Sequence, residues 1–360
     1  MKLLNVYQLY IVKKYFQNFI KVTGVFICLI LIMNLLEEIN FFRNTNEKVL
    51  IPIYLTILNL PSILFEIFPF IFLITSILFF LDMLDSNEIK TLKTFGVTNL
   101  KILNILGLSC LITGILIITL FYSLSTSFKS KYLETKNKFT KDDKYLAVIT
   151  ANGLWIRDVV EGNINFISAD RIIDNNLINV TITKFDENLK LEKSIFSKKV
   201  DINNYSWFLN EPVVNINNKR EKFNTMEFRS NFNLDKLLSL FNNLSALSLF
   251  EIESLKKDYE LLGYSTKLLD NFKLKIYLYP LYLTLMALTG SILMLNIKHD
   301  KPKIFHIIMG IIISVVIYYI SYFTENITET KDLPYYTSTI SVQIVLFVII
   351  AINLQKINEK

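Results

Sequence analysis

Residues that could carry catalysis are few in this chain of 360 residues. Its two cysteines, Cys28 and Cys110, lie inside apolar runs, and its two histidines, His299 and His306, stand seven residues apart. A protein zinc site usually needs four such ligands, so no metal site is expected. None of the nine glycines precedes a lysine, which excludes a Walker A phosphate loop, and the H-E-x-x-H and G-x-S-x-G motifs are also absent. We therefore expect no enzyme and no cofactor of its own, with any energy supplied by a partner.

Residues 85–97 separate two apolar runs and combine one carboxylate with a regular apolar spacing. A capping residue precedes Glu88, and Gly96 can end the helix that Glu88 begins. Apolar side chains follow at every third position, which predicts a short amphipathic helix. It either lies across lipid headgroups or docks on a soluble partner protein. The residues that such a partner would contact are Asp85, Asn87, Glu88, Ile89, Leu92, Phe95 and Gly96.

Glu66 places a carboxyl group inside an apolar run, between Pro61 and Pro69. An ionisable group there is unfavourable unless it faces a wet cavity or a partner group. Glu66 therefore either lines a cavity or gate, or reaches interfacial water. Side chains of the first and fifth apolar runs could line an acyl-chain cavity, and could equally face lipid. With Glu66, these candidates are Phe26, Leu29, Met33, Asn34, Ile313, Ile317 and Tyr318.

The apolar residues that surround these candidates form membrane-spanning helices. Hydrophobic residues make up 52% of the chain, and the mean hydropathy is +0.40. A spanning helix needs about 20 predominantly apolar residues. In the second run we expect an interfacial lead-in over 50–60 before the span itself. The six expected spans are 15–36, 62–83, 102–124, 273–295, 304–323 and 335–354.

The distribution of lysine orients this bundle. Cytoplasmic loops of membrane proteins are enriched in Lys and Arg. Lysines gather before the first span, where they can snorkel, and in the loops 85–101 and 296–303, while the opposite short loops are acidic. We therefore expect both termini in the cytoplasm and the segment between spans three and four outside. The formal net charge of +6 follows from these loops rather than from a nucleic-acid surface.

The middle of the chain changes from helical periodicity to alternation. Short runs rich in Ile, Val, Phe, Tyr and Thr are separated by turn-forming Asn, Asp and Gly. This pattern predicts an inserted all-β domain, jelly-roll-like, over 129–270, between membrane segments 1–128 and 271–360. Its last part, about 247–270, is expected to be an amphipathic helix that Gly263 can end. The expected strands are Tyr145–Thr150, Leu154–Arg157, Ile164–Ser168, Ile178–Lys184, Leu191–Val200 and Trp207–Leu209.

Several short fragments follow one another in a characteristic order. Pro61 and Pro69 stand eight residues apart, Glu88 follows nineteen residues later, and Gly96 another eight. Downstream lie Gly153-Leu154-Trp155 with Asp158, Asn165-Phe166-Ile167, Arg171-Ile172, Leu247-Ser248, Pro280-Leu281, Gly310, Tyr318 and Leu333-Pro334. Over nearly the whole chain this order resembles the lipopolysaccharide export permeases of the LptF/LptG family. The Gly-Leu-Trp-x-x-Asp fragment is most like LptG.

The resemblance implies an ABC-type half-transporter of the inner membrane in Gram-negative cells. Such permeases pair as an LptF–LptG heterodimer, bind two copies of the ATPase LptB, which holds the ATP, and carry a periplasmic jelly roll that meets LptC. The pair extracts lipopolysaccharide from the inner membrane and passes it to a periplasmic bridge toward the outer membrane. Residues 85–97 would be the coupling helix, with Glu88 as its acidic contact on the ATPase.

One departure from the family concerns the outer end of the first span. Family members often carry basic residues there, proposed to meet lipid A phosphates, whereas this chain has Asn34, Glu37 and Glu38. The phosphate contacts would then move to Arg43, to Lys48 or to the partner subunit. A second functional hypothesis is a non-transporting anchor or mechanotransmission subunit that regulates a periplasmic enzyme.

Overall fold

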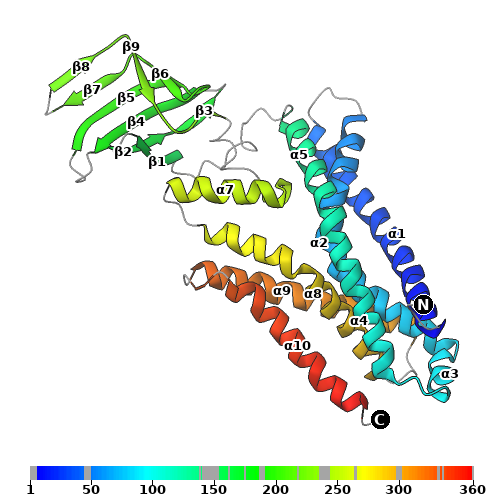
Figure 1. Ribbon diagram of the computed structural model, residues 1–360. Helices are drawn as coiled ribbons and strands as arrows, with labels where there is room; N and C mark the ends of the chain where they lie inside the picture. The colour runs from blue at the N-terminus through cyan, green and yellow to red at the C-terminus, as the bar shows by residue number, and fades with distance from the viewer. Residues whose placement is uncertain are drawn as a thin grey trace. The chain divides into compact units, whose positions relative to one another are not determined.

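The computed structural model describes most of the chain in two compact units, Met1–Lys129 with Asp270–Lys360, and Ser130–Leu269. The described residues are 6–43, 50–137, 139, 154–160, 163–173, 176–185, 191–216, 219–234, 244–262, 266–296, 302–330, 333–334 and 336–358. Figure 1 labels the helices and strands of both units.

The first unit is a helical bundle, and six of its helices are long and apolar enough to cross a membrane. This confirms the predicted membrane bundle with three helices on each side of an insert. The helices are α1 (Val6–Phe42), α2 (Leu50–Asp85), α3 (Glu88–Thr94), α4 (Asn99–Leu116), α5 (Ser123–Asn137, begun in this unit), α8 (Lys267–Asn296), α9 (Lys303–Thr330) and α10 (Tyr336–Asn358). A π-helical turn, η1 (Ile117–Tyr122), joins α4 to α5, so the third span runs well beyond the predicted end at residue 124.

Helix α2 is continuous, so residues 50–60, predicted to be an interfacial lead-in, form the first turns of the same helix as the span over 62–83. Proline lacks an N–H and leaves the carbonyl four residues earlier without its helical partner. For Pro69 that carbonyl belongs to Phe65, and the hydroxyl of Tyr279 on α8 donates a hydrogen bond to it. A neighbouring helix thus satisfies the freed backbone group, and α2 continues through both prolines.

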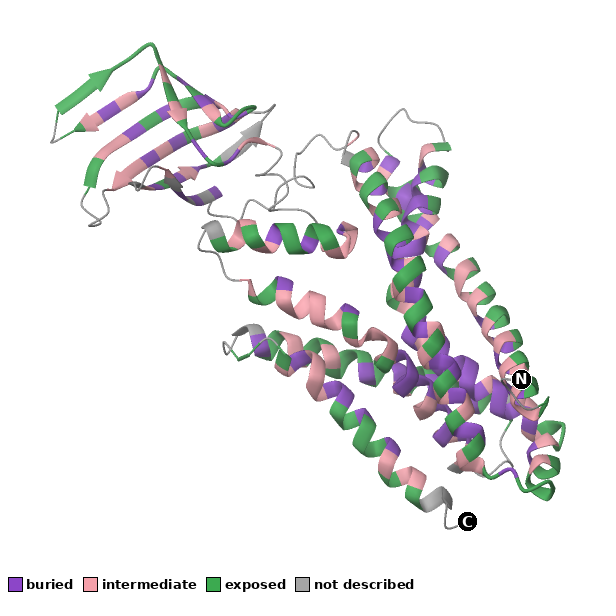
Figure 2. Cartoon of the chain, in the orientation of Figure 1, coloured by how far each residue is buried: buried purple, intermediate pink, exposed green. Residues whose placement is uncertain are grey.

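Glycines let two helices approach α2 closely. A Cβ on Gly290 of α8 would lie 2.5 Å from the carbonyl oxygen of Leu73, and one on Gly310 of α9 would lie 2.3 Å from Cδ1 of Ile77. In its most apolar stretch α2 has 67% of its residues buried, against 17% in α1. Figure 2 shows buried residues concentrated where α2 meets these helices. Helix α2 is therefore the centre of the bundle.

The second unit contains an antiparallel sheet, as predicted for the inserted segment. Within the described residues β5 pairs with β4, β6 and β7, so the sheet is branched. Five of the predicted strands are present, and Tyr145–Thr150 lies outside the described residues. The strands are β1 (Leu154–Val160), β2 (Asn163–Ala169), β3 (Arg171–Ile173), β4 (Asn176–Phe185), β5 (Leu191–Asp201), β6 (Ser206–Asn210), β7 (Val213–Ile216), β8 (Lys219–Lys222) and β9 (Thr225–Arg229).

One row of aliphatic side chains explains the register of five strands. Ile156 on β1 pairs with Ile167 on β2, Ile167 with Ile182 on β4, Ile182 with Ile195 on β5, and Ile195 with Val214 on β7. All five are buried. A slip of one residue would turn this row to the opposite face, so burial selects the observed register.

A buried carboxylate ties β1 to the segment after β9. Asp158 is 1% exposed, and its Oδ2 accepts hydrogen bonds from Ser230 Oγ at 2.8 Å and from the backbone N–H of Asn231 at 3.1 Å. The side-chain amide of Asn231 donates to Oδ1 at 2.9 Å. The Asp of the Gly-Leu-Trp-x-x-Asp fragment thus has a structural role in closing the β unit.

The predicted helix over about 247–270 is two helices instead. Helix α7 (Leu249–Leu262) ends before Thr266, which is not helical, and Lys267 begins α8. Ser248 and Glu251 form a reciprocal capping box at the start of α7: the Ser248 N–H donates to Oε2 of Glu251 at 2.7 Å, and the Glu251 N–H donates to Ser248 Oγ at 3.4 Å. Gly263, the predicted cap, lies outside the described residues.

Replacing Gly290 with alanine should weaken the packing of α8 on α2, because the new Cβ would need space that the Leu73 carbonyl occupies. We expect the free energy of unfolding to fall by roughly 1–3 kcal/mol. Thermal unfolding of the detergent-solubilised chain measures this. Gly24→Ala is the matched control, since a Cβ there meets nothing within 4 Å. Equal unfolding temperatures for the two variants would contradict the close approach.

Candidate functional site

Helix α3 is shaped by left-handed backbone at both ends. Asn87, at its N-cap, has a φ of 56°, and Gly96, beyond its end, has a φ of 78°. The Gly96 N–H donates to the Lys93 carbonyl and the Val97 N–H to the Leu92 carbonyl, both at 3.0 Å, which is a Schellman motif. Gly96 ends the helix as predicted. The side chain of Asn87 makes no capping hydrogen bond, so its contribution is its tolerance of left-handed backbone.

The side chains of the apolar ridge predicted on this helix do not all face the same surroundings. Ile89 is 4% exposed and belongs to the bundle core, and Leu92 packs against that core. Phe95 is 80% exposed. Asp85, Asn87 and Gly96 are also exposed. The ridge therefore attaches α3 to the bundle through Ile89 and Leu92, while its last residue, Phe95, lies on the surface.

Glu88 is bound within the chain. Nζ of Lys14 on α1 lies 2.5 Å from its Oε2, with 17% and 27% of the two side chains exposed. Lys14 also lies over the ring of Tyr10, 5.9 Å from its centroid. Burial raises the pKa of Glu88, but hydrogen bonds from Lys14, Ser86 and Tyr10 outweigh it, and the pKa lies below its ordinary value of 4.5. An ionised Glu88 thus fastens α3 to the beginning of α1.

A second site is a cavity of about 350 Å³ among α2, α8, α9 and α10. Its polar groups come from all four helices, and its walls are rich in aromatic rings. The lining residues are Phe65, Glu66, Pro69, Phe70, Phe272, Lys275, Ile276, Tyr279, Tyr282, Tyr318, Ser321, Tyr322, Glu325, Ser338, Thr339, Val342 and Gln343.

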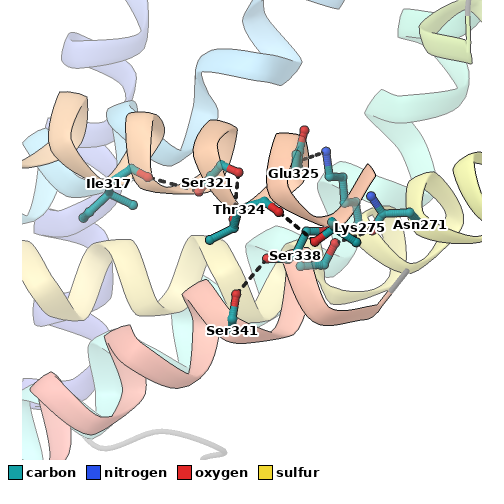
Figure 3. Close-up of polar contacts among 10 residues, drawn as sticks. Asn271, Lys275, Ile317, Ser321, Thr324, Glu325, Ser338 and Ser341 are labelled. Carbon is teal, nitrogen blue, oxygen red and sulfur yellow. Dashed lines mark hydrogen bonds and ion pairs between the residues drawn. The ribbon is translucent and has the colours of Figure 1, made fainter. Parts of the chain in front are cut away.

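Polar contacts hold three of these helices together (Figure 3). Lys275 on α8 forms an ion pair with Glu325 on α9. Oδ1 of Asn271 on α8 accepts hydrogen bonds from the hydroxyls of Ser338 at 3.3 Å and Thr339 at 2.7 Å, both on α10. Pairing of this kind is how charged and polar side chains are accommodated in apolar surroundings.

The predicted cavity residues fall in different places. Glu66 and Tyr318 line the cavity, together with side chains that we did not predict. Ile317 is 7% exposed and lies in the core, against which Ile313 and Phe26 also pack. Leu29 and Met33 are exposed on α1, 52% and 69% respectively.

Asn34 does not line this cavity either. It is 2% exposed: its amide donates to the Thr56 carbonyl at 3.3 Å, and its Oδ1 accepts from Asn59 at 3.2 Å. Lys129 on α5 in turn donates to Asn59 at 2.7 Å. Asn34 thus joins a polar chain that packs α1 against α2, a role that its sequence position alone did not indicate.

Two important charges were predicted to have other roles. Lys14 was expected to snorkel, and Glu325 was counted in an acidic loop, although α9 continues to Thr330. Lys275, in the third turn of α8, was given no role by the sequence. A charged residue inside an apolar helix is a recognisable signal for a pair, but the sequence does not indicate which residue completes it.

The chain matches the family described as "Lipopolysaccharide export system permease LptF/LptG" over residues 9–356. This match takes in both groups of spanning helices and the inserted sheet. Among curated proteins none matches the chain.

Neutralising either member of the Lys14–Glu88 pair should loosen α3. We expect faster hydrogen exchange of the amides at 88–94 in Lys14→Met and in Glu88→Gln, because each removes one ion-pair partner. The double variant should add little to either single variant, since the partners share one interaction. Additive effects would mean that the two side chains stabilise α3 independently.

The same pair predicts a pH dependence. Since the folded pKa of Glu88 is below 4.5, its contribution is fully present above the unfolded pKa and is lost as the pH falls through the folded value. The protection of the amides at 88–94, taken relative to their intrinsic exchange rate at each pH, should therefore fall at acid pH more in the wild type than in Glu88→Gln. The same loss of protection in both proteins would assign it to other groups.

Proposed function

Because the chain belongs to the lipopolysaccharide export permease family LptF/LptG, we propose that it is the transporting membrane subunit of an ABC-type exporter that extracts lipopolysaccharide from the inner membrane. The observation that carries this proposal is a family match across residues 9–356, since it includes both helix groups and the insert between them. The six apolar helices agree with a multi-pass membrane protein.

The proposed orientation follows from the distribution of lysines. Both termini and α3 lie in the cytoplasm and the β unit in the periplasm, where it would meet an LptC-like component and a periplasmic bridge. A second permease subunit of the LptF type would complete the membrane part. We assign this chain to the LptG type from its Gly-Leu-Trp-x-x-Asp fragment. The Asp of that fragment, Asp158, is buried in the β unit.

Helix α3 is the proposed contact for an ATPase dimer of the LptB type. The chain has no Walker A sequence, so ATP would be bound and hydrolysed by that partner. Phe95 offers an exposed aromatic side chain, the kind that dominates binding energy when a partner pocket buries it. Glu88 keeps 27% of its side chain exposed while it holds Lys14, so it can meet a cation of the ATPase and also connect that contact to α1.

The lipid path would use the exposed aliphatic face of α1, which includes Leu29 and Met33. Acyl chains need an apolar surface that they can reach from the bilayer, and this face meets that requirement. The polar cavity between α2 and α8–α10 is a separate environment, suited to a headgroup rather than to an acyl chain.

Substitution at the tip of α3 should separate the permease from its ATPase. We expect Phe95→Asp and Glu88→Arg each to lower ATPase recovery in a pull-down by roughly tenfold or more, while membrane insertion is unchanged. Phe250→Asp is the matched control, because Phe250 is 90% exposed on α7. Undiminished recovery with Phe95→Asp and Glu88→Arg would remove the proposed role of α3.

A photoreactive residue at position 33 should crosslink to lipopolysaccharide in the assembled transporter, because Met33 lies on the proposed path. The same label at Met83, which is 0% exposed, should give no adduct. Mass spectrometry of the adducts identifies lipid A. If the residue at position 33 forms no adduct with lipopolysaccharide, the result would favour a membrane anchor that does not transport.

A further inference from the structure

We propose that the cavity between α2, α8, α9 and α10 binds the ammonium group of a phosphoethanolamine headgroup, with Glu66 as its counter-ion. The inference deepens the proposed lipid transport by naming a headgroup chemistry. It rests on that proposal for the lipid nature of the ligand and for the orientation of the helices.

The cavity is lined by one more acidic side chain than basic side chains. Two carboxylates, Glu66 and Glu325, and one ammonium, Lys275, line it. Lys275 is paired with Glu325. Within the described chain, Glu66 makes no hydrogen bond and has no ion pair. Lys129 attracts it electrostatically, but the ammonium of Lys129 is bonded to Asn59 at 2.7 Å. Among the described residues, no lysine or arginine therefore forms an ion pair with Glu66.

An ionised carboxylate in an apolar span is unfavourable without a cation or water. Glu66 sits between Pro61 and Pro69 on α2 and is exposed toward the cavity. A cation that entered the cavity would offset this penalty. The cavity is large enough for a headgroup, since small-ligand sites begin at about 300 Å³.

The walls select an organic cation over a hydrated metal ion. Aromatic side chains line the cavity, among them Phe70, Tyr282, Tyr318 and Tyr322. Aromatic faces attract ammonium groups and hold their apolar neighbours, with the strongest effect where the cation is desolvated. A metal ion would instead need several oxygen ligands. Across the described residues no group of three or more His, Cys, Asp and Glu could hold one.

Lys275 indicates that the ligand carries a phosphate as well as its own ammonium group. A lysine ammonium has three donors, and Glu325 does not use all of them, so Lys275 can also donate to a phosphate oxygen. Ser338 and Thr339, in the first turn of α10, place hydroxyls on the same cavity. An ammonium and a phosphate on one small ligand are the chemistry of phosphoethanolamine.

The position of the cavity, near the ends of three helices, agrees with a lipid headgroup as its ligand. Lys275 lies in the third turn of α8 and Ser338 in the first turn of α10, while Glu325 is five residues before the end of α9. These are the helix ends that lie, in the proposed orientation, at the periplasmic leaflet. Phosphoethanolamine occurs there both on phospholipid and as a substituent of lipopolysaccharide.

The test measures lipid retained by the solubilised full chain with native mass spectrometry. Phosphatidylethanolamine and phosphatidylglycerol of identical acyl chains are supplied in equal amounts. We expect the wild type to retain the ethanolamine lipid roughly tenfold better and Glu66→Gln to retain both equally. Glu260→Gln, at an exposed position on α7, is the matched control and should behave as the wild type.

Two results would overturn the inference. One is a wild type that retains both lipids equally, a measurement that does not depend on the folding of any variant. The other is an unchanged ethanolamine preference in Glu66→Gln. A third arm offers lipopolysaccharide with and without phosphoethanolamine: preference for the substituted form assigns the site to the transported lipid, and indifference assigns it to phospholipid.

This test is separate from that of the proposed function. A chain that crosslinks to lipopolysaccharide at position 33 but shows no ethanolamine preference remains a permease without this site. A chain with the preference but without the crosslink keeps the site and loses the transport proposal.

Discussion

The close contact of α8 and α9 with α2 is the constraint on which the rest of the bundle depends. Gly290 brings α8 against the backbone of α2 at Leu73, and Gly310 brings α9 against the side chain of Ile77 on α2. In lipid there is little hydrophobic drive between helices, so such small-residue crossings and buried hydrogen bonds must hold them together. Residues of α2 before this crossing line the cavity, and α3 follows α2 after it. Helix α2 thus lines the candidate headgroup site and leads into α3, which carries the candidate ATPase contact.

Three polar contacts of the membrane unit join elements that are distant in sequence. Tyr279 compensates the carbonyl that Pro69 leaves free, Lys14 holds Glu88, and Lys275 holds Glu325. Glu66 is different because no described residue bonds it. A carboxylate that no described residue bonds, in a cavity lined by aromatic rings, is the feature that most directly suggests a ligand.

Helix α3 shows how one short element can have two tasks. Ile89 and Leu92 attach it to the bundle, and Glu88 attaches it to α1. Phe95 remains outside. A partner that moves Phe95 would therefore pull on α1 through an ion pair as well as on α2 through the chain. In the proposed function, this arrangement would transmit conformational changes of the partner ATPase to the membrane helices.

The sequence by itself determined the six spans, the β insert, Gly96 as the end of α3, and the family. These depend on local composition and spacing, since apolar length specifies a span and alternation specifies a strand. Only the tertiary structure decided that α2 runs unbroken through Pro61 and Pro69, that Asn34 is buried, and that Lys14 and Lys275 find their acidic partners. The physical reason is that a proline's freed carbonyl, or a charge in an apolar helix, requires a partner without specifying it. Those partners lie between 50 and 214 residues away along the chain for the three pairs, and folding alone brings them together.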